Sequence, residues 1–122
     1  MSHSPEFLKI VDDAKSRITQ TDVAAVLARV KKGEKILLVD VREDNEWTAG
    51  RAAGAIHIGK GVIERDIEET IPDKDADIVL YCGGGFRSAL AADTLKQMGY
   101  TRVSSMDGGI RGWREAGLAE EK

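Results

Sequence analysis

Two uninterrupted apolar runs restrict this chain to a layered fold with a buried sheet. The runs are KILLVDV at 35–41 and ADIVLYC at 76–82, and both are rich in β-prone residues with little polar alternation. Strands of this kind are buried on both faces, which is typical of parallel sheets covered by helices. A chain of 122 residues has room for one such core and little more.

Helical patterns fill the stretches around these runs. Helices are expected at 6–17, 21–31, 42–50, 61–72, 87–99 and 107–117, and brief strands at 55–58 and 102–106. Thr19 and Asp22, three residues apart, indicate a capping box before the helix at 21–31. The alternation predicts an α/β fold with a central, mostly parallel β-sheet flanked by helices.

The first part of the chain is expected to form a separate extension. We predict an N-terminal helical extension over residues 1–18 and the main domain over residues 19–122. The alternative for the extension is a tail without fixed structure. The helical interpretation depends on apolar side chains that fall on one face, namely Phe7, Leu8, Ile10, Val11 and Ala14.

Composition excludes several functional classes. The net charge is -3 and there is no basic block, so nucleic-acid binding is not expected. No apolar run is long enough to cross a bilayer, and the N-terminus lacks the apolar core of a secretory signal, so no membrane partner is expected. A single cysteine fits a reducing, cytoplasmic location. One Cys and two His at unrelated spacings predict no metal site, and no cofactor is expected. A monomer is the default expectation, because no strong dimerisation face is evident.

The only cysteine lies at a position where parallel sheets bind ligands. Cys82 ends the second apolar run and is followed by Gly83–Gly85, Phe86 and Arg87. Ligands of such sheets sit beyond the carboxyl ends of the strands. The next helix is expected to start near Ser88, which places the loop at a helix N-terminus with free amides. Glycines let successive amides turn inward and form a nest for an anion.

This setting predicts a reactive thiolate. A free cysteine has a pKa of about 8.5, and helix N-termini or nearby cations lower it. A loop that stabilises Cys82 as an anion also attracts an anionic substrate to it. The alternative is that Cys82 is a small buried hydrophobe and that the glycines only make a tight turn. Three consecutive glycines cost backbone entropy, so that alternative needs another reason for them.

Four segments, in this order, resemble signatures of the rhodanese (sulfurtransferase) family. They are LLVDVREDNEW, GAIHI, YCGGGFRSALAADTLKQMGY and VSSMDGGIRGW, and the likeness runs from about Thr19 to Leu118. The resemblance implies that residues 19–122 form a single rhodanese-like domain. One departure is the segment GRAAGA, in which Arg51 and Ala53 replace the His and Pro that family members often have.

The resemblance also implies a persulfide mechanism without a cofactor or metal. Cys82 would attack a small anionic sulfur donor such as thiosulfate, carry the sulfur as a persulfide, and pass it to cyanide or a thiol. A thiol-bearing protein could also serve as the partner. Arg87 matches the arginine at the end of the family's active-site loop. The substrate would be bound by the residues that follow the nucleophile, namely Gly83, Gly84, Gly85, Phe86, Arg87 and Ser88.

Other functions stay open at this stage. The domain could be a sulfur-relay module acting on a partner protein, or an inactive interaction domain, although the intact Cys82 and Arg87 argue against inactivity. Related phosphatases and arsenate reductases have a loop one residue longer between Cys and Arg than the four residues found here. Asp40 and Arg42 end the first apolar run at the same sheet edge. A supporting role in catalysis is open for them, and an ion pair that braces the loop is favoured.

Overall fold

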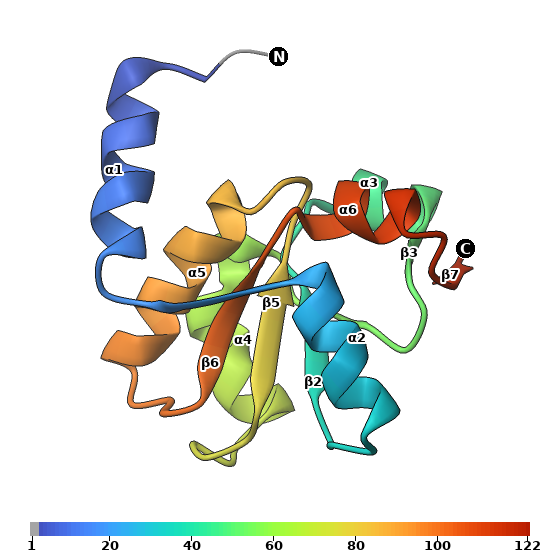
Figure 1. The fold of residues 1–122 in the computed structure, drawn as a ribbon. Helices are drawn as coiled ribbons and strands as arrows, with labels where there is room; N and C mark the ends of the chain where they lie inside the picture. The colour runs from blue at the N-terminus through green and yellow to red at the C-terminus, as the bar shows by residue number, and fades with distance from the viewer. Residues whose placement is uncertain (1–2) are drawn as a thin grey trace.

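The computed structural model describes residues 3–122 and contains a parallel sheet with helices on both faces (Figure 1). The strand order in this sheet is β1-β6-β5-β2-β4, and every pairing is parallel. The strands are β1 (Thr19–Asp22), β2 (Leu37–Asp40), β4 (Ile56–His57), β5 (Ile78–Tyr81) and β6 (Val103–Asp107). The predicted α/β class is confirmed, and β5, which leads to Cys82, is the central strand.

Each helix expected from the sequence is present. They are α1 (Pro5–Lys15), α2 (Val23–Lys31), α3 (Asp44–Ala49), α4 (Ile63–Thr70), α5 (Phe86–Gln97) and α6 (Gly109–Glu115), with a 3-10 turn, η1 (Lys60–Val62), before α4. An antiparallel pair of very short strands, β3 (Arg51–Ala52) and β7 (Glu120–Glu121), was not expected. Between His3 and Lys122, no helix has the length and apolar character needed to cross a membrane.

The pleat of β5 divides the core between two faces of the sheet, because successive side chains of a strand point to opposite sides. Ile78 and Leu80 pack with residues of α4 and α5. Val79 and Tyr81 pack with residues of α2 and α6. Both faces of β5 are therefore buried, which explains why its sequence is apolar throughout.

Helix α1 is anchored on α5, the helix that follows Cys82 (Figure 1). Val11 and Ala14 are almost completely buried. Nη2 of Arg17 lies 2.7 Å from a carboxylate oxygen of Asp93 on α5, and Nζ of Lys96 donates to the carbonyl of Arg17. Helix α1 therefore packs against the helix that follows the loop at Cys82.

The predicted capping box at 19–22 is wrong in one of its two residues. Thr19 lies in β1 and pairs with Ser104 of β6, so it makes no helix cap. Asp22 is the N-cap of α2, and its Oδ1 accepts a hydrogen bond of 2.8 Å from the amide of Ala25. The segment TQTD is an exposed edge strand, whose polar side chains are compatible with pairing on one side only.

Candidate active site

Cys82 lies at the carboxyl end of the central strand, where the chain leaves β5 and turns into α5. Helix α5 begins at Phe86, slightly before the predicted start near Ser88. Its N-cap is Gly85, which has φ +123° and no side chain to cap the helix. This positive φ is a conformation that other residues rarely adopt. Gly85 therefore allows the sharp turn that carries the first turn of α5 back over the sulfur.

The sulfur of Cys82 is held by hydrogen-bond donors of the following turn. The amide of Gly85 donates to Sγ at 3.1 Å and the amide of Ser88 at 3.4 Å. Oγ of Ser88 lies 3.5 Å from Sγ and 2.8 Å from the hydroxyl of Ser105 on β6. Ser88 is fully buried and is not among the residues that line the pocket next to the sulfur. The two serines form a buried hydroxyl chain that ends at the thiol.

These donors shift the ionisation of the thiol. Burial by itself raises the pKa of Cys82, because a buried charge is poorly solvated. Hydrogen bonds from the Ser88 hydroxyl and from the amides of Ser88, Gly85 and Gly84 act in the opposite direction. The combined effect of the hydrogen bonds exceeds that of burial, so the pKa of Cys82 lies below the ordinary value of a thiol. A larger fraction of Cys82 is therefore thiolate, the nucleophilic form, at neutral pH.

Removing the Ser88 hydroxyl is expected to raise the pKa of Cys82. In Ser88→Ala the amide donors remain, but one donor to the thiolate is lost. The rate of alkylation by iodoacetamide should rise with pH in both proteins, with the midpoint at higher pH in the variant. The wild-type midpoint should lie below that of an ordinary free thiol measured in the same way. Identical midpoints in the two proteins would show that Ser88 does not tune the thiol.

The backbone of the loop is tied to the start of α6. The carbonyls of Cys82, Gly83 and Gly84 accept hydrogen bonds of 2.9, 3.2 and 3.0 Å from three amides of the segment Gly108–Arg111. In contrast, the amides of Gly83, Phe86 and Arg87 have no hydrogen-bond acceptor within residues 3–122. Fixed carbonyls and free amides make the loop suited to binding an anion.

Gly109 makes this close approach of the two segments possible. It has φ +51°, and a Cβ atom at this position would overlap the carbonyl oxygen of Cys82 and lie 2.8 Å from the carbonyl carbon of Gly83. Only glycine combines this conformation with this proximity. Gly109 was not predicted as a site residue, although it belongs to the DGGIRGW segment that carries the family resemblance.

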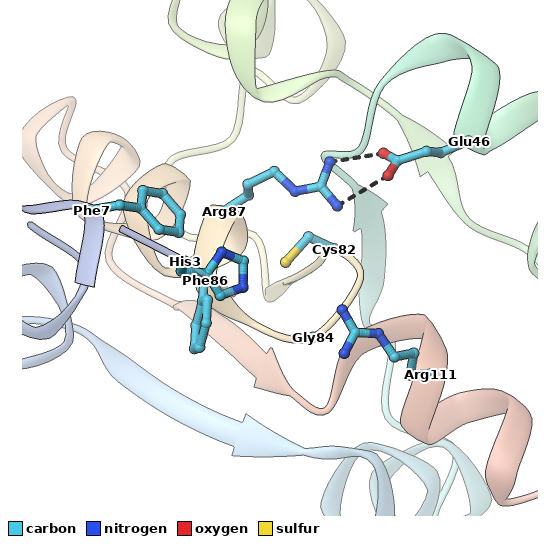
Figure 2. A pocket seen from close by; sticks show the side chains of 8 residues that line it. All are labelled: His3, Phe7, Glu46, Cys82, Gly84, Phe86, Arg87 and Arg111. Carbon is cyan, nitrogen blue, oxygen red and sulfur yellow. Dashed lines mark hydrogen bonds and ion pairs between the residues drawn. The ribbon is translucent and has the colours of Figure 1, made fainter. Parts of the chain in front are cut away.

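The guanidinium of Arg87 is engaged by a carboxylate. Its Nη1 and Nη2 donate to the two carboxylate oxygens of Glu46 on α3 at 2.8 and 3.2 Å (Figure 2). This bidentate pair is half-buried, and it holds the pKa of the Glu46 carboxyl below its usual range. Arg87 therefore links the loop to α3, and its charge is already compensated. Glu46 was missed because it stands in a polar segment with no motif of its own.

A pocket of about 520 Å³ opens over the sulfur (Figure 2). Of the residues predicted to bind substrate, Gly84, Phe86 and Arg87 line it, while Gly83, Gly85 and Ser88 do not. The other lining residues, which were not predicted, are His3, Phe7, Glu46 and Arg111. His3 and Phe7 come from the N-terminal extension. Their rings lie 4.8 and 6.2 Å from that of Phe86, so the extension supplies an aromatic wall.

Asp40 and Arg42 do not line this pocket. They form a buried ion pair, with Nη2 of Arg42 at 2.8 Å from Oδ2 of Asp40. Arg42 also donates to the carbonyl of Gly50 at 2.7 Å, and its own carbonyl is 2.8 Å from Nε2 of His57. The geometry is that of a brace that joins the end of β2 to the end of α3 and to β4.

Arg51, the residue that departs from the family pattern, packs on the surface of α3. Its guanidinium lies 4.5 Å from the ring of Trp47, and Nη1 donates to the Trp47 carbonyl. Trp47 in turn stacks on His57. Arg51 is absent from the lining of the pocket around Cys82. In the part of the chain from His3 onward, no three Cys, His or acidic residues gather as metal ligands.

The fold and the site define an α/β domain with one amide-bound thiol at the end of its central strand. The profile of the rhodanese-like domain family matches residues 22–116, and the chain belongs to this family. A sulfurtransferase of Allochromatium vinosum is 37% identical over 101 residues, which are 83% of this chain and 92% of that protein. The family and this relative support a role as a sulfurtransferase.

Solved structures show the same fold. A Rhodopseudomonas palustris protein of unknown function, described as a possible tyrosine phosphatase, has a TM-score of 0.83 and 30% identity, with 99% of this chain and 98% of that chain covered. A thiosulfate sulfurtransferase of Pseudomonas aeruginosa has a TM-score of 0.77 and 28% identity, with 86% of this chain but only 20% of that chain covered.

Proposed function

We propose that this protein is a sulfurtransferase that moves a sulfane sulfur from thiosulfate or a similar donor to cyanide or a thiol through a persulfide on Cys82. The observation that carries the proposal is the environment of Sγ. It receives hydrogen bonds from two amides, lies beside a buried hydroxyl and faces a pocket that contains two arginines. The free thiol of a sulfur carrier must stay reduced, so a cytoplasmic location fits this function.

In the first step the Cys82 thiolate attacks the outer sulfur of thiosulfate. A bond forms between Sγ and that sulfur, and the sulfur–sulfur bond of the donor breaks. Its electron pair leaves with sulfite, and Cys82 becomes a persulfide anion, so the charges balance. The unpaired amides of Gly83, Phe86 and Arg87 would stabilise the negative charge on the outer sulfur. In the second step cyanide attacks the outer sulfur, thiocyanate leaves, and the thiolate is restored.

The intact mass of the protein after incubation with thiosulfate tests this proposal. We expect the mass of one sulfur atom to be added, and cyanide should remove it with release of thiocyanate. Because Cys82 is the only cysteine, protein alkylated with iodoacetamide is a specific control that should gain nothing. An unmodified mass together with a readily alkylated Cys82 would favour a relay module with another donor. An unmodified mass and an unreactive Cys82 would refute the proposal.

Phosphatase activity is less compatible with the site. A phosphate monoester carries two negative charges, and in the related phosphatases an arginine at the end of a longer loop contributes to binding. Here Arg87 already binds both oxygens of Glu46, and the loop is one residue shorter. Hydrolysis of p-nitrophenyl phosphate should therefore be undetectable under conditions in which thiocyanate is formed.

A further inference from the structure

Arg111 brings a second guanidinium to the active-site loop. It is the third residue of α6, and its backbone amide donates to the carbonyl of Gly83 at 3.2 Å. A Cβ atom on Gly84 would lie 3.6 Å from both Cζ and Nη2 of Arg111, and one on Gly83 would lie 3.6 Å from the same Nη2. Figure 2 shows this side chain pointing from α6 toward the loop that holds Cys82. The cation is therefore held against the two glycines that follow the nucleophile.

The charge of Arg111 is not compensated by a neighbouring carboxylate. Within residues 3–122 it forms no ion pair. Asp107, four residues earlier, lies against Gly85 instead. Arg87, the other arginine of the pocket, is bound by Glu46. An anion that enters the pocket thus meets one cation that is already paired and one that is available.

The rest of the pocket adds little positive charge. The wall opposite Arg111 consists of the rings of His3, Phe7 and Phe86 (Figure 2). Phe7 and Phe86 are apolar, and the only carboxylate in the lining belongs to Glu46, which is occupied by Arg87. A ligand with an anionic end is therefore expected to place that end toward Arg111.

We propose that Arg111 binds the anionic end of the sulfur donor and makes the site selective for charged donors over neutral ones. The identity of the donor in this inference rests on the proposed function. The position of the anion site does not, because it is argued from the placement of Arg111 alone. With thiosulfate, two sulfonate oxygens would bind the planar guanidinium while the outer sulfur faces Sγ. When the sulfur–sulfur bond breaks, the leaving sulfite gains charge next to a cation.

Two measurements on Arg111→Gln test this assignment. The first compares the alkylation rates of Cys82 by anionic iodoacetate and neutral iodoacetamide. The variant should lose about fivefold or more with iodoacetate and remain nearly unchanged with iodoacetamide, because only the charged reagent uses the cation. The second is steady-state kinetics with thiosulfate and cyanide. The KM for thiosulfate should rise about tenfold or more, since a charge-assisted hydrogen-bond pair is lost.

The chain offers matched controls for these measurements. Arg114 stands on the same helix and is paired with Glu120, away from the pocket lining. Arg114→Gln removes the same charge from α6 and should leave the ratio of the two alkylation rates unchanged. Arg111→Lys keeps a charge but loses the planar fork, and it should recover part of the iodoacetate rate. An equal fall of the ratio in the Arg114 and Arg111 variants would overturn the assignment.

Failure of this inference can be told apart from failure of the proposed function. A wild-type protein that takes up sulfur, with an Arg111→Gln variant unchanged in both measurements, would refute the role of Arg111 and leave the sulfurtransferase proposal intact. A wild-type protein that takes up no sulfur from thiosulfate, with a selective loss of iodoacetate reactivity in the variant, would support the anion site and refute thiosulfate as the donor.

Discussion

Replacing Cys82 by serine is expected to abolish sulfur transfer to cyanide, with a fall in rate of at least about a thousandfold. A serine hydroxyl is not ionised at neutral pH and cannot accept the sulfur as a persulfide. The fold should survive, because the serine oxygen can accept the hydrogen bonds that the amides of Gly85 and Ser88 now donate to Sγ. The measurement is thiocyanate formation by purified variant and wild type, alongside urea denaturation.

Cys82→Ala serves as the control that separates the two roles of the side chain. It removes the nucleophile and also leaves the loop amides without an acceptor. It should match Cys82→Ser in lost activity but be less stable. Thiocyanate formation by either folded variant at more than about one hundredth of the wild-type rate would contradict the assignment of Cys82 as the sulfur carrier.

Replacing Gly109 by alanine is expected to cause the largest loss of stability, about 3 to 5 kcal/mol. The new Cβ would overlap the carbonyl oxygen of Cys82 and press on the backbone of Gly83, so the start of α6 or the loop must move. Either movement breaks hydrogen bonds to the loop carbonyls. The free energy of unfolding from urea denaturation measures the effect, and activity should fall because the amides around Sγ are displaced.

Gly117→Ala is the matched control for this substitution. Gly117 also has a positive φ, +72°, and follows the same helix, but a Cβ there would meet no atom within 4 Å. The control therefore carries the conformational penalty of about 1 kcal/mol without the overlap. If the two variants lost equal stability, the close approach at Gly109 would be of no energetic consequence.

The buried strands and the long helices were predictable because their signals are local. The runs that contain β2 and β5 are apolar on both faces, and the helix that contains α5 shows a clear packing pattern. The strand β1 was missed because TQTD is polar and exposed. It pairs with β6, which follows more than eighty residues later. Such an edge strand has no periodic apolar pattern.

The site was predictable only in part, because some of its contacts are local in sequence and others join remote segments. Cys82 and its glycines are adjacent in sequence, so they could be singled out as the candidate site. The partners that complete the site are remote: Glu46 binds Arg87 across 41 positions, and Ser105 bonds Ser88 across 17. Arg111 lies in a short helix, and nothing in the sequence around it distinguishes it from a solvent-exposed arginine. Only the packing of α6 against the loop gives Arg111 its place.

The aromatic wall of the pocket has a consequence for how this protein can diversify. Phe7 belongs to α1 and His3 lies just before this helix, so both are outside the residues matched by the family profile, whereas the thiol and its amides lie inside them. Part of the pocket wall is thus supplied from outside the segment that carries the thiol and the amides around it. Changes in the first helix can alter which molecules reach the thiol while the reaction itself is preserved, so ligand preference and reactivity are separately adjustable.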